Sequence, residues 1–213
     1  MKRNLPGRIA VLVIGLWIMS LGIAFSIAAG LGTSSISSLP YTLSMLTPLT
    51  VGTATIILHV ILIMLQTLIL SHRYRPIQLL QLPLAVLFGL LTDASNVMLG
   101  FLSPSSYLGS WLFCLIGIIL VAAGVSAEVL SGTIPLAAEG LSLALSEATG
   151  RKFGTMKVSV DCPLVAPSLI LSFIFLRRWG GVREGTIAAA LLVGTIARIF
   201  NKVLLPIKTK YFE

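Results

Sequence analysis

The distribution of charge constrains this chain most: charged side chains are nearly absent from six long apolar runs and gather between them. An α-helix of about 20 residues crosses a hydrocarbon layer of roughly 30 Å. A soluble chain of 213 residues with a mean hydropathy of +1.02 cannot keep so much apolar surface out of water. We therefore predict one all-α, polytopic membrane domain over 1–213, with transmembrane helices at 9–31, 51–70, 77–101, 108–130, 158–176 and 186–206.

The basic excess fits a partner that is a lipid bilayer. The chain has 15 basic and 7 acidic residues, and the basic ones flank the apolar runs. The interleaved aromatic and basic residues of nucleic-acid-binding proteins are absent, so we expect no nucleic acid partner. With the N-terminus in the cytoplasm, eleven basic residues lie inside and only Arg177, Arg178 and Arg183 outside, which predicts that both termini are cytoplasmic. The basic 177–183 loop is an exception that the sequence does not explain.

The chain repeats itself. At an offset of 102, Gly15, Gly22, Gly30 and Gly52 recur as glycines, and at an offset of 105 Asn96 recurs as Asn201. Each repeat (about 8–101 and about 108–206) contains three predicted spans, and an odd number makes the second copy enter the membrane upside down. The N-terminal run resembles a signal peptide, but it is long and has a counterpart in the second repeat, so we predict a transmembrane helix. Inverted repeats are common in secondary transporters.

Two linkers, 32–50 and 131–150, occupy equivalent places in the repeats. Both begin with glycine and small polar residues, contain proline and continue with leucines at helical spacing. Neither is long or apolar enough to span, so each predicts a short helix that is either re-entrant, lining a site, or flat at the interface. In the first linker, hydroxyl groups are candidate site ligands, from Ser34, Ser35, Ser37 and Tyr41.

Ionisable side chains inside apolar spans are costly and are the best candidates for a solute site. Four occur, at Asp93, Glu128, Asp161 and Arg198. Asp93 and Arg198 are equivalent at the offset of 105, so they are candidates for a pair between the repeats, either lining a site or only locking the two halves together. His59 and Asp161 are equivalent at the offset of 102.

Helical spacing extends this set. Asn96 and Asn201 lie one turn beyond Asp93 and Arg198, so each helix presents a charge and an amide on one face. Lys157 and Asp161 have the i, i+4 spacing of a local ion pair. Glu128 is either a site residue or reaches the cytoplasmic headgroup region, and we expect Glu139 and Glu147 to reach that region.

Catalytic and metal-binding patterns are absent from the sequence. It has no Gly-x-Ser-x-Gly elbow, no HExxH pair and no phosphate-binding loop, so we expect no enzyme. Its two cysteines, Cys114 and Cys162, and its two histidines are too few and too far apart for a metal centre. We expect no metal and no cofactor.

Three segments resemble a known group of proteins: LGTSSISSLPYTLS (31–44), EGLSLALSEATGRKFGTMKVSVD (139–161) and REGTIAAALLVGTIARIF (183–200). They resemble the YczE/YyaS/YitT group of bacterial integral membrane proteins, and the resemblance runs from about residue 8 to 201. It implies a bacterial cytoplasmic membrane protein and supplies no substrate. Many YczE-like members carry Pro-Trp-Asp after Gly-Leu-Gly, where this chain has Thr33-Ser34-Ser35, so no role of that motif transfers.

The sequence favours a small multi-pass transporter or permease that moves a small solute, with coupling to protons through Asp93 or Asp161. Two alternatives stay open. One is a substrate-binding membrane subunit that works with a separate ATPase, and the other is a non-transporting accessory or scaffold protein. A homo-oligomer is compatible with each of them.

Overall fold

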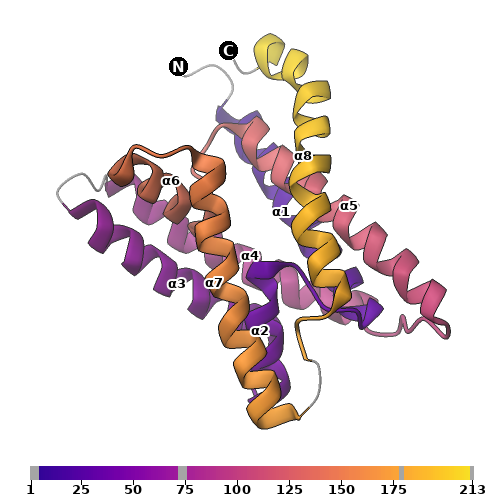
Figure 1. Ribbon diagram of the computed structural model, residues 1–213. Helices are drawn as coiled ribbons and strands as arrows, with labels where there is room; N and C mark the ends of the chain where they lie inside the picture. The colour runs from indigo at the N-terminus through magenta and orange to yellow at the C-terminus, as the bar shows by residue number, and fades with distance from the viewer. Residues whose placement is uncertain (1–4, 72–75, 178–179, 212–213) are drawn as a thin grey trace. The chain divides into compact units, whose positions relative to one another are not determined.

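The computed structural model describes residues 5–71, 76–177 and 180–211, which fold into helices joined by short connections, with no strand in those ranges (Figure 1). Six helices are long and apolar enough to cross a membrane, which confirms the predicted fold class. They are Leu5–Ala29 (α1), Val51–Leu70 (α3), Ile77–Leu99 (the end of the 3-10 helix η2, Pro76–Leu80, with α4, Gln81–Leu99), Tyr107–Ser131 (α5), Thr155–Leu176 (α7, Phe153–Leu171, with the π-helix η3, Ser172–Leu176) and Glu184–Leu204 (within α8, Glu184–Tyr211).

Two short helices fall in the predicted linkers. They are α2 (Ser35–Leu46), of 12 residues, and α6 (Ala137–Thr149), of 13 residues. At 1.5 Å per residue each is roughly 20 Å long or less, too short to cross a bilayer.

The bounds of the helices repeat at the same offset, 102 residues, at which the sequence repeats. Adding 102 to the bounds of α1 gives 107 and 131, which are the bounds of α5. The same addition carries α2 to 137–148 and α3 to 153–172, within one residue of α6 and α7. The two halves of the chain therefore repeat one succession of long and short helices.

The helices gather into two compact units. The first contains α1, α5, α8 and the last turns of α4, and the second contains α2, α3, α6, α7 with η3 and the rest of α4. Each unit thus combines elements from both sequence repeats.

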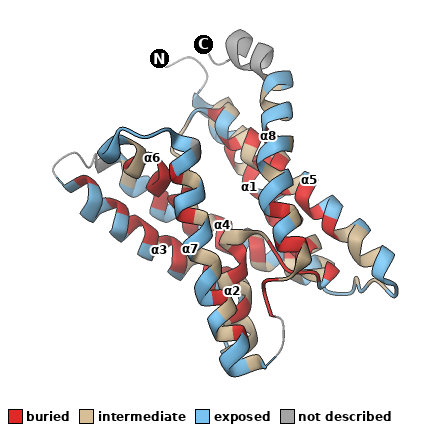
Figure 2. Cartoon of the chain, viewed as in Figure 1, coloured by how far each residue is buried: buried red, intermediate tan, exposed pale blue. Residues whose placement is uncertain are grey.

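In the first unit, α1 and α5 pack through glycines. A Cβ at Gly22 would lie 2.7 Å from the carbonyl oxygen of Gly117, and one at Gly124 would lie 2.6 Å from that of Gly15. The residue numbers rise along one helix and fall along the other, so the helices are antiparallel. Glycine is needed here because two backbones touch. The facing sides of both helices are buried (Figure 2).

The same contacts carry the repeat relation. At the offset of 102, Gly15 corresponds to Gly117 and Gly22 to Gly124. The contact of Gly22 with Gly117 is therefore the repeat equivalent of the contact of Gly124 with Gly15. The recurring glycines are therefore the surfaces through which the first helices of the two repeats meet.

The third helix of this unit, α8, begins against the ends of α1 and α5. The N–H of Gly185 donates to the carbonyl oxygen of Leu31 at 2.8 Å, and Ala189 joins a buried cluster with Leu31, Cys114 and Ile118. Much of the rest of α8 is exposed (Figure 2).

Arginines close the C-terminal ends of α1 and α5. The Nη1 of Arg183 donates to the carbonyl oxygen of Gly30 at 2.7 Å, and the guanidinium of Arg8 donates to the carbonyl oxygens of Ser131 and Gly132. Gly30 and Gly132 are repeat equivalents, both in the left-handed conformation that ends a helix. A cation at a helix C-terminus is favourable. Arg183, in the basic 177–183 loop, therefore has a structural role at the end of α1.

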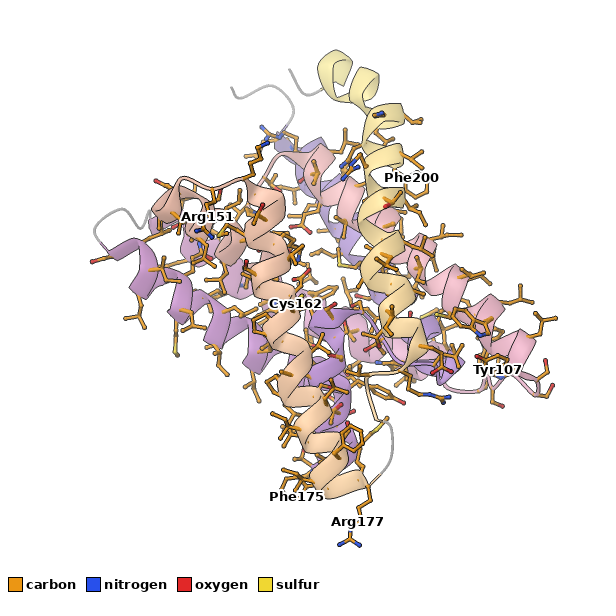
Figure 3. All side chains as sticks on the ribbon, in the orientation of Figure 1. Tyr107, Arg151, Cys162, Phe175, Arg177 and Phe200 are labelled. Carbon is orange, nitrogen blue, oxygen red and sulfur yellow. The ribbon has the colours of Figure 1, made fainter. Side chains whose placement is uncertain are left out.

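We expect Arg183→Gln to destabilise the protein by about 1–2 kcal/mol, because a charged hydrogen bond to a helix end is lost. Arg177→Gln is the matched control: Arg177 is in the same loop and points away from the neighbouring side chains (Figure 3). Thermal unfolding in detergent measures both. Equal melting temperatures for the two variants would contradict this role of Arg183.

The second unit packs both short helices against long ones. Buried residues of α6 (Ala137, Ala138 and Leu141) form one cluster with Leu58, Leu62 and Ile63 of α3. These three α3 residues lie within three positions of the middle of Val51–Leu70. On the other side of the unit, Thr42 of α2 contacts Ser168 of α7, near the middle of the span Thr155–Leu176. Both short helices therefore lie beside central parts of long helices.

Candidate functional site

An ion cluster joins α6 to α7 in the second unit. The Nζ of Lys157 lies 3.1 Å from Oε1 of Glu139 and 3.0 Å from Oδ1 of Asp161, and all three side chains are less than one-third exposed. The expected pair of Lys157 and Asp161 is thus confirmed. The carboxylate of Glu139 turns to Lys157, because α6 packs along α7 and α3, and its expected reach to the headgroup region stays a prediction.

This cluster holds two carboxylates against one ammonium. Burial by itself would raise the pKa of the Glu139 carboxyl, but the charge of Lys157 and its hydrogen bond hold that pKa below its ordinary value. Paired charges of this kind are costly to separate in a medium of low dielectric constant. The arrangement therefore keeps Glu139 ionised beside a long helix.

His59 of α3 is fully buried beside the cluster. Its ring stacks on Phe88 of α4, with centroids 5.7 Å apart, and neither ring nitrogen has a hydrogen-bond partner in the described part of the chain. Glu139 and His59 are close enough to interact electrostatically. A buried imidazole with both nitrogens unsatisfied is a polar group available to a ligand or a proton.

Two glutamines form a second polar group, seven residues further along α3. Gln66 of α3 and Gln81 of α4 are fully buried, and their amide ends meet at Gly140 of α6. A Cβ at Gly140 would lie 2.6 Å from Oε1 of Gln66 and 2.5 Å from Nε2 of Gln81. In the described residues, both amide atoms of Gln66 and the Oε1 of Gln81 lack hydrogen-bond partners. Buried amides without partners are uncommon in proteins.

Polar groups follow one face of α3 from end to end. At its N-terminus, Asp93 accepts from the N–H of Gly52 at 2.7 Å and from the hydroxyl of Thr50 at 2.6 Å. Gly52, His59 and Gln66 are seven residues apart, which places them on the same helix face. We call this line, from Asp93 through His59 to Gln66, the polar track. It lies entirely within the second unit.

The repeat-related place, in which the two repeats exchange roles, is satisfied internally. Gln66 and Gly140 correspond at the offset of 102 to Ser168 and Ser38. There, Ser168 shares a 2.7 Å hydrogen bond with Thr42 and donates to the carbonyl oxygen of Ser38 at 3.1 Å. The two related places have therefore diverged: one carries small hydroxyls that bond to each other, and the other carries larger amides with atoms that have no partner in the described residues.

Asp93 and Asn96 lie on α4, but not in one unit. Asp93 belongs to the second unit, where Thr50 and Gly52 use both of its carboxylate oxygens. Asn96 belongs to the first, and its Nδ2 is buried without a partner in the described residues. Asp93 therefore secures the start of α3 and ends the polar track.

The candidates on α5 and α8 lie in the first unit. Arg198 is exposed on α8 and Asn201 is half-buried, so the pairing of Arg198 with Asp93 stays a prediction. Glu128 is buried beside the α1–α5 contact, and both its role in a site and its reach to the headgroups stay predictions. Glu147 is exposed, and its expected place in the headgroup region stays a prediction.

The hydroxyl candidates divide between the units. Ser34 ends the first unit, while Ser35, Ser37 and Tyr41 are on α2 in the second. Ser37 is buried, and the other three are half-buried. Their neighbour Ser38 donates to the carbonyl oxygen of Ser35 at 2.8 Å, a bond that belongs to the α2 helix itself.

Sequence reasoning missed Glu139, Gln66 and Gln81 as site residues. Gln66 lies in an apolar run and Gln81 lies near the start of another. An uncharged polar residue within an apolar run could have identified both, but a search for charged residues alone does not find them. The partner of Glu139 depends on where α6 packs, which helical spacing does not give.

The chain was compared with protein-family models, with curated proteins and with solved structures. No curated protein and no solved structure matched. One family model, described as a family of unknown function (DUF6198), matches residues 6–202. This match covers all of the long helices except the first residue of α1 and the end of α8. The chain, a multi-pass helical protein of membrane type, belongs to the DUF6198 family of unknown function.

Proposed function

We propose that this protein is a small membrane transporter or permease whose translocation site includes the polar track and the ion cluster of the second unit. The observation that carries the proposal is the group of buried polar side chains along α3, beside a helix too short to span. Polar groups at membrane depth are costly and are found where they serve transport.

The depth of α6 supports this proposal. Its N-terminal half packs against the middle of α3, and α2 contacts α7 near the middle of its span. We infer that both short helices are re-entrant. Half-spanning helices with polar surroundings are a recurrent way to build solute sites near the bilayer midplane.

The repeat relation supports it as well. Helix bounds that agree at one offset, and an antiparallel glycine contact that maps onto itself at that offset, are expected of two repeats inserted in opposite senses. We infer inverted repeats, with both termini in the cytoplasm of a bacterial cell. A relation between this family and the YczE/YyaS/YitT group follows from the sequence resemblance and belongs to the same proposal.

Proton coupling is part of the proposal. Glu139 and Asp161 share Lys157, so protonation of one carboxylate leaves Lys157 with the other. His59 lies within electrostatic reach of Glu139, so a change in the charge of Glu139 is felt at the buried ring. If solute binding draws Lys157 toward one of these carboxylates, the other carboxylate can take up a proton.

Purified protein in liposomes loaded with a pH-sensitive dye tests this function. We expect at least one solute from a panel of small amines, amides, carboxylates and sugars to change the internal pH faster than in protein-free vesicles. Glu139→Gln should reduce this proton movement by about tenfold or more, while Glu147→Gln, at an exposed position of the same helix, should not. Rates equal to those of empty vesicles for every solute would contradict a transporter.

A further inference from the structure

We propose that Gln66 and Gln81, where they meet at Gly140, form a subsite for a small neutral solute with a carboxamide- or urea-type edge. This inference rests on the proposed function, and it names the class of solute. Gln66 comes from α3, Gln81 from α4 and Gly140 from α6, so three helices build the subsite within one unit.

The hydrogen-bond donors and acceptors of the subsite decide which polar group of a solute can bind there. Oε1 of Gln66 and Oε1 of Gln81 are buried acceptors, and Nε2 of Gln66 is a buried donor, all without partners in the described part of the chain. An amide or urea edge presents N–H donors and a C=O acceptor side by side, so it satisfies both kinds of group. An ammonium or guanidinium group has no acceptor for Nε2 of Gln66.

Charge selects against anions. Glu139, the neighbour of Gly140 in the sequence, belongs to the cluster with Lys157 and Asp161, two carboxylates and one ammonium. A carboxylate solute would meet this negative balance and would have no N–H for the two glutamine oxygens. A neutral edge also avoids the cost of moving an ion into a buried site.

Glycine at position 140 lets the two amides meet. A methyl group there would come within 2.6 Å of Oε1 of Gln66 and within 2.5 Å of Nε2 of Gln81, and the flexible glutamine ends would have to move. The equivalent pair, Ser38 and Ser168, is bonded internally, so only one of the two related places carries unsatisfied amides.

Three probes with a three-carbon skeleton separate the head groups: propionamide, propionate and n-propylammonium. Saturation-transfer NMR with the full chain in nanodiscs reports which of them binds. We expect propionamide to be saturated by the wild-type protein and its signal to fall about tenfold in Gln66→Leu. Gln78→Leu, in η2 and outside the subsite, is the matched control and should keep the signal.

Folding is checked by size-exclusion chromatography, and Gln81→Leu and Gly140→Ala are second variants if Gln66→Leu does not fold. Saturation of propylammonium or propionate in place of propionamide would overturn the assigned class. No saturation of any probe would overturn the subsite and leave the amides as hydrated core groups. Binding without transport in liposomes would contradict the proposed function alone, and transport with no binding of propionamide would contradict this inference alone.

Discussion

Gly22→Leu should abolish the folded protein. A Cβ at Gly22 would lie 2.7 Å from both the carbonyl oxygen of Gly117 and the backbone nitrogen of Val121, and neither atom can move without shifting α5. Four more carbon atoms at a backbone contact force the helices apart. We expect the free energy of unfolding to fall by about 3 kcal/mol or more, which is a large share of the total stability of many proteins.

Fluorescence-detected size-exclusion chromatography after mild detergent extraction measures this result as loss of the monodisperse peak. Gly117→Leu, on the other side of the contact, should behave in the same way. Gly194→Leu is the control, because Gly194 is exposed on α8 and a Cβ there meets no atom within 4 Å. If Gly22→Leu and Gly194→Leu gave equal peaks, α1 and α5 would not pack through this contact.

Lys157→Met should have the second largest effect. The variant leaves Glu139 and Asp161 without their shared cation in a largely buried place. Removing one partner of a buried ion pair costs about 3–5 kcal/mol. We expect a marked fall in melting temperature, whereas Lys152→Met should change it little, since Lys152 is exposed.

A rescue separates stability from function. Neutralising the carboxylates as well, in Lys157→Met/Glu139→Gln/Asp161→Asn, removes the stranded charges and should restore most of the melting temperature. The same triple variant should not restore proton-coupled movement of solute. A single Lys157→Met variant as stable as the wild type would show that the cluster contributes little to folding.

The long helices could be predicted from the sequence because hydrophobic length alone decides them. The run 51–70 corresponds to α3 without a change of bounds. Others shifted by a few residues: α7 begins at Phe153 instead of 158, because polar residues such as Lys157 and Asp161 pair with each other and extend the helix. The repeat offset was also visible, because glycines recur where backbones touch.

Only part of the candidate site could be predicted from the sequence. Helical spacing gave the bond of Lys157 to Asp161, since both are on one helix. It did not give Glu139, which reaches Lys157 from α6, or the meeting of Gln66 with Gln81, which comes from α3 and α4 lying antiparallel. Such contacts depend on how helices pack, and the periodicity of one helix carries no information about its neighbour.

In the proposed topology, the two repeats cross the membrane in opposite senses. Thr47 and Thr149 are equivalent at the offset of 102, both are exposed, and each follows a short helix or ends one. Single cysteines at these positions, with Cys114 and Cys162 replaced by serine, are probed with a membrane-impermeant thiol reagent in intact and in permeabilised cells. We predict labelling of Thr47→Cys in intact cells and of Thr149→Cys only after permeabilisation. Labelling of both from the same side would contradict the inverted repeats and the transport site built on them.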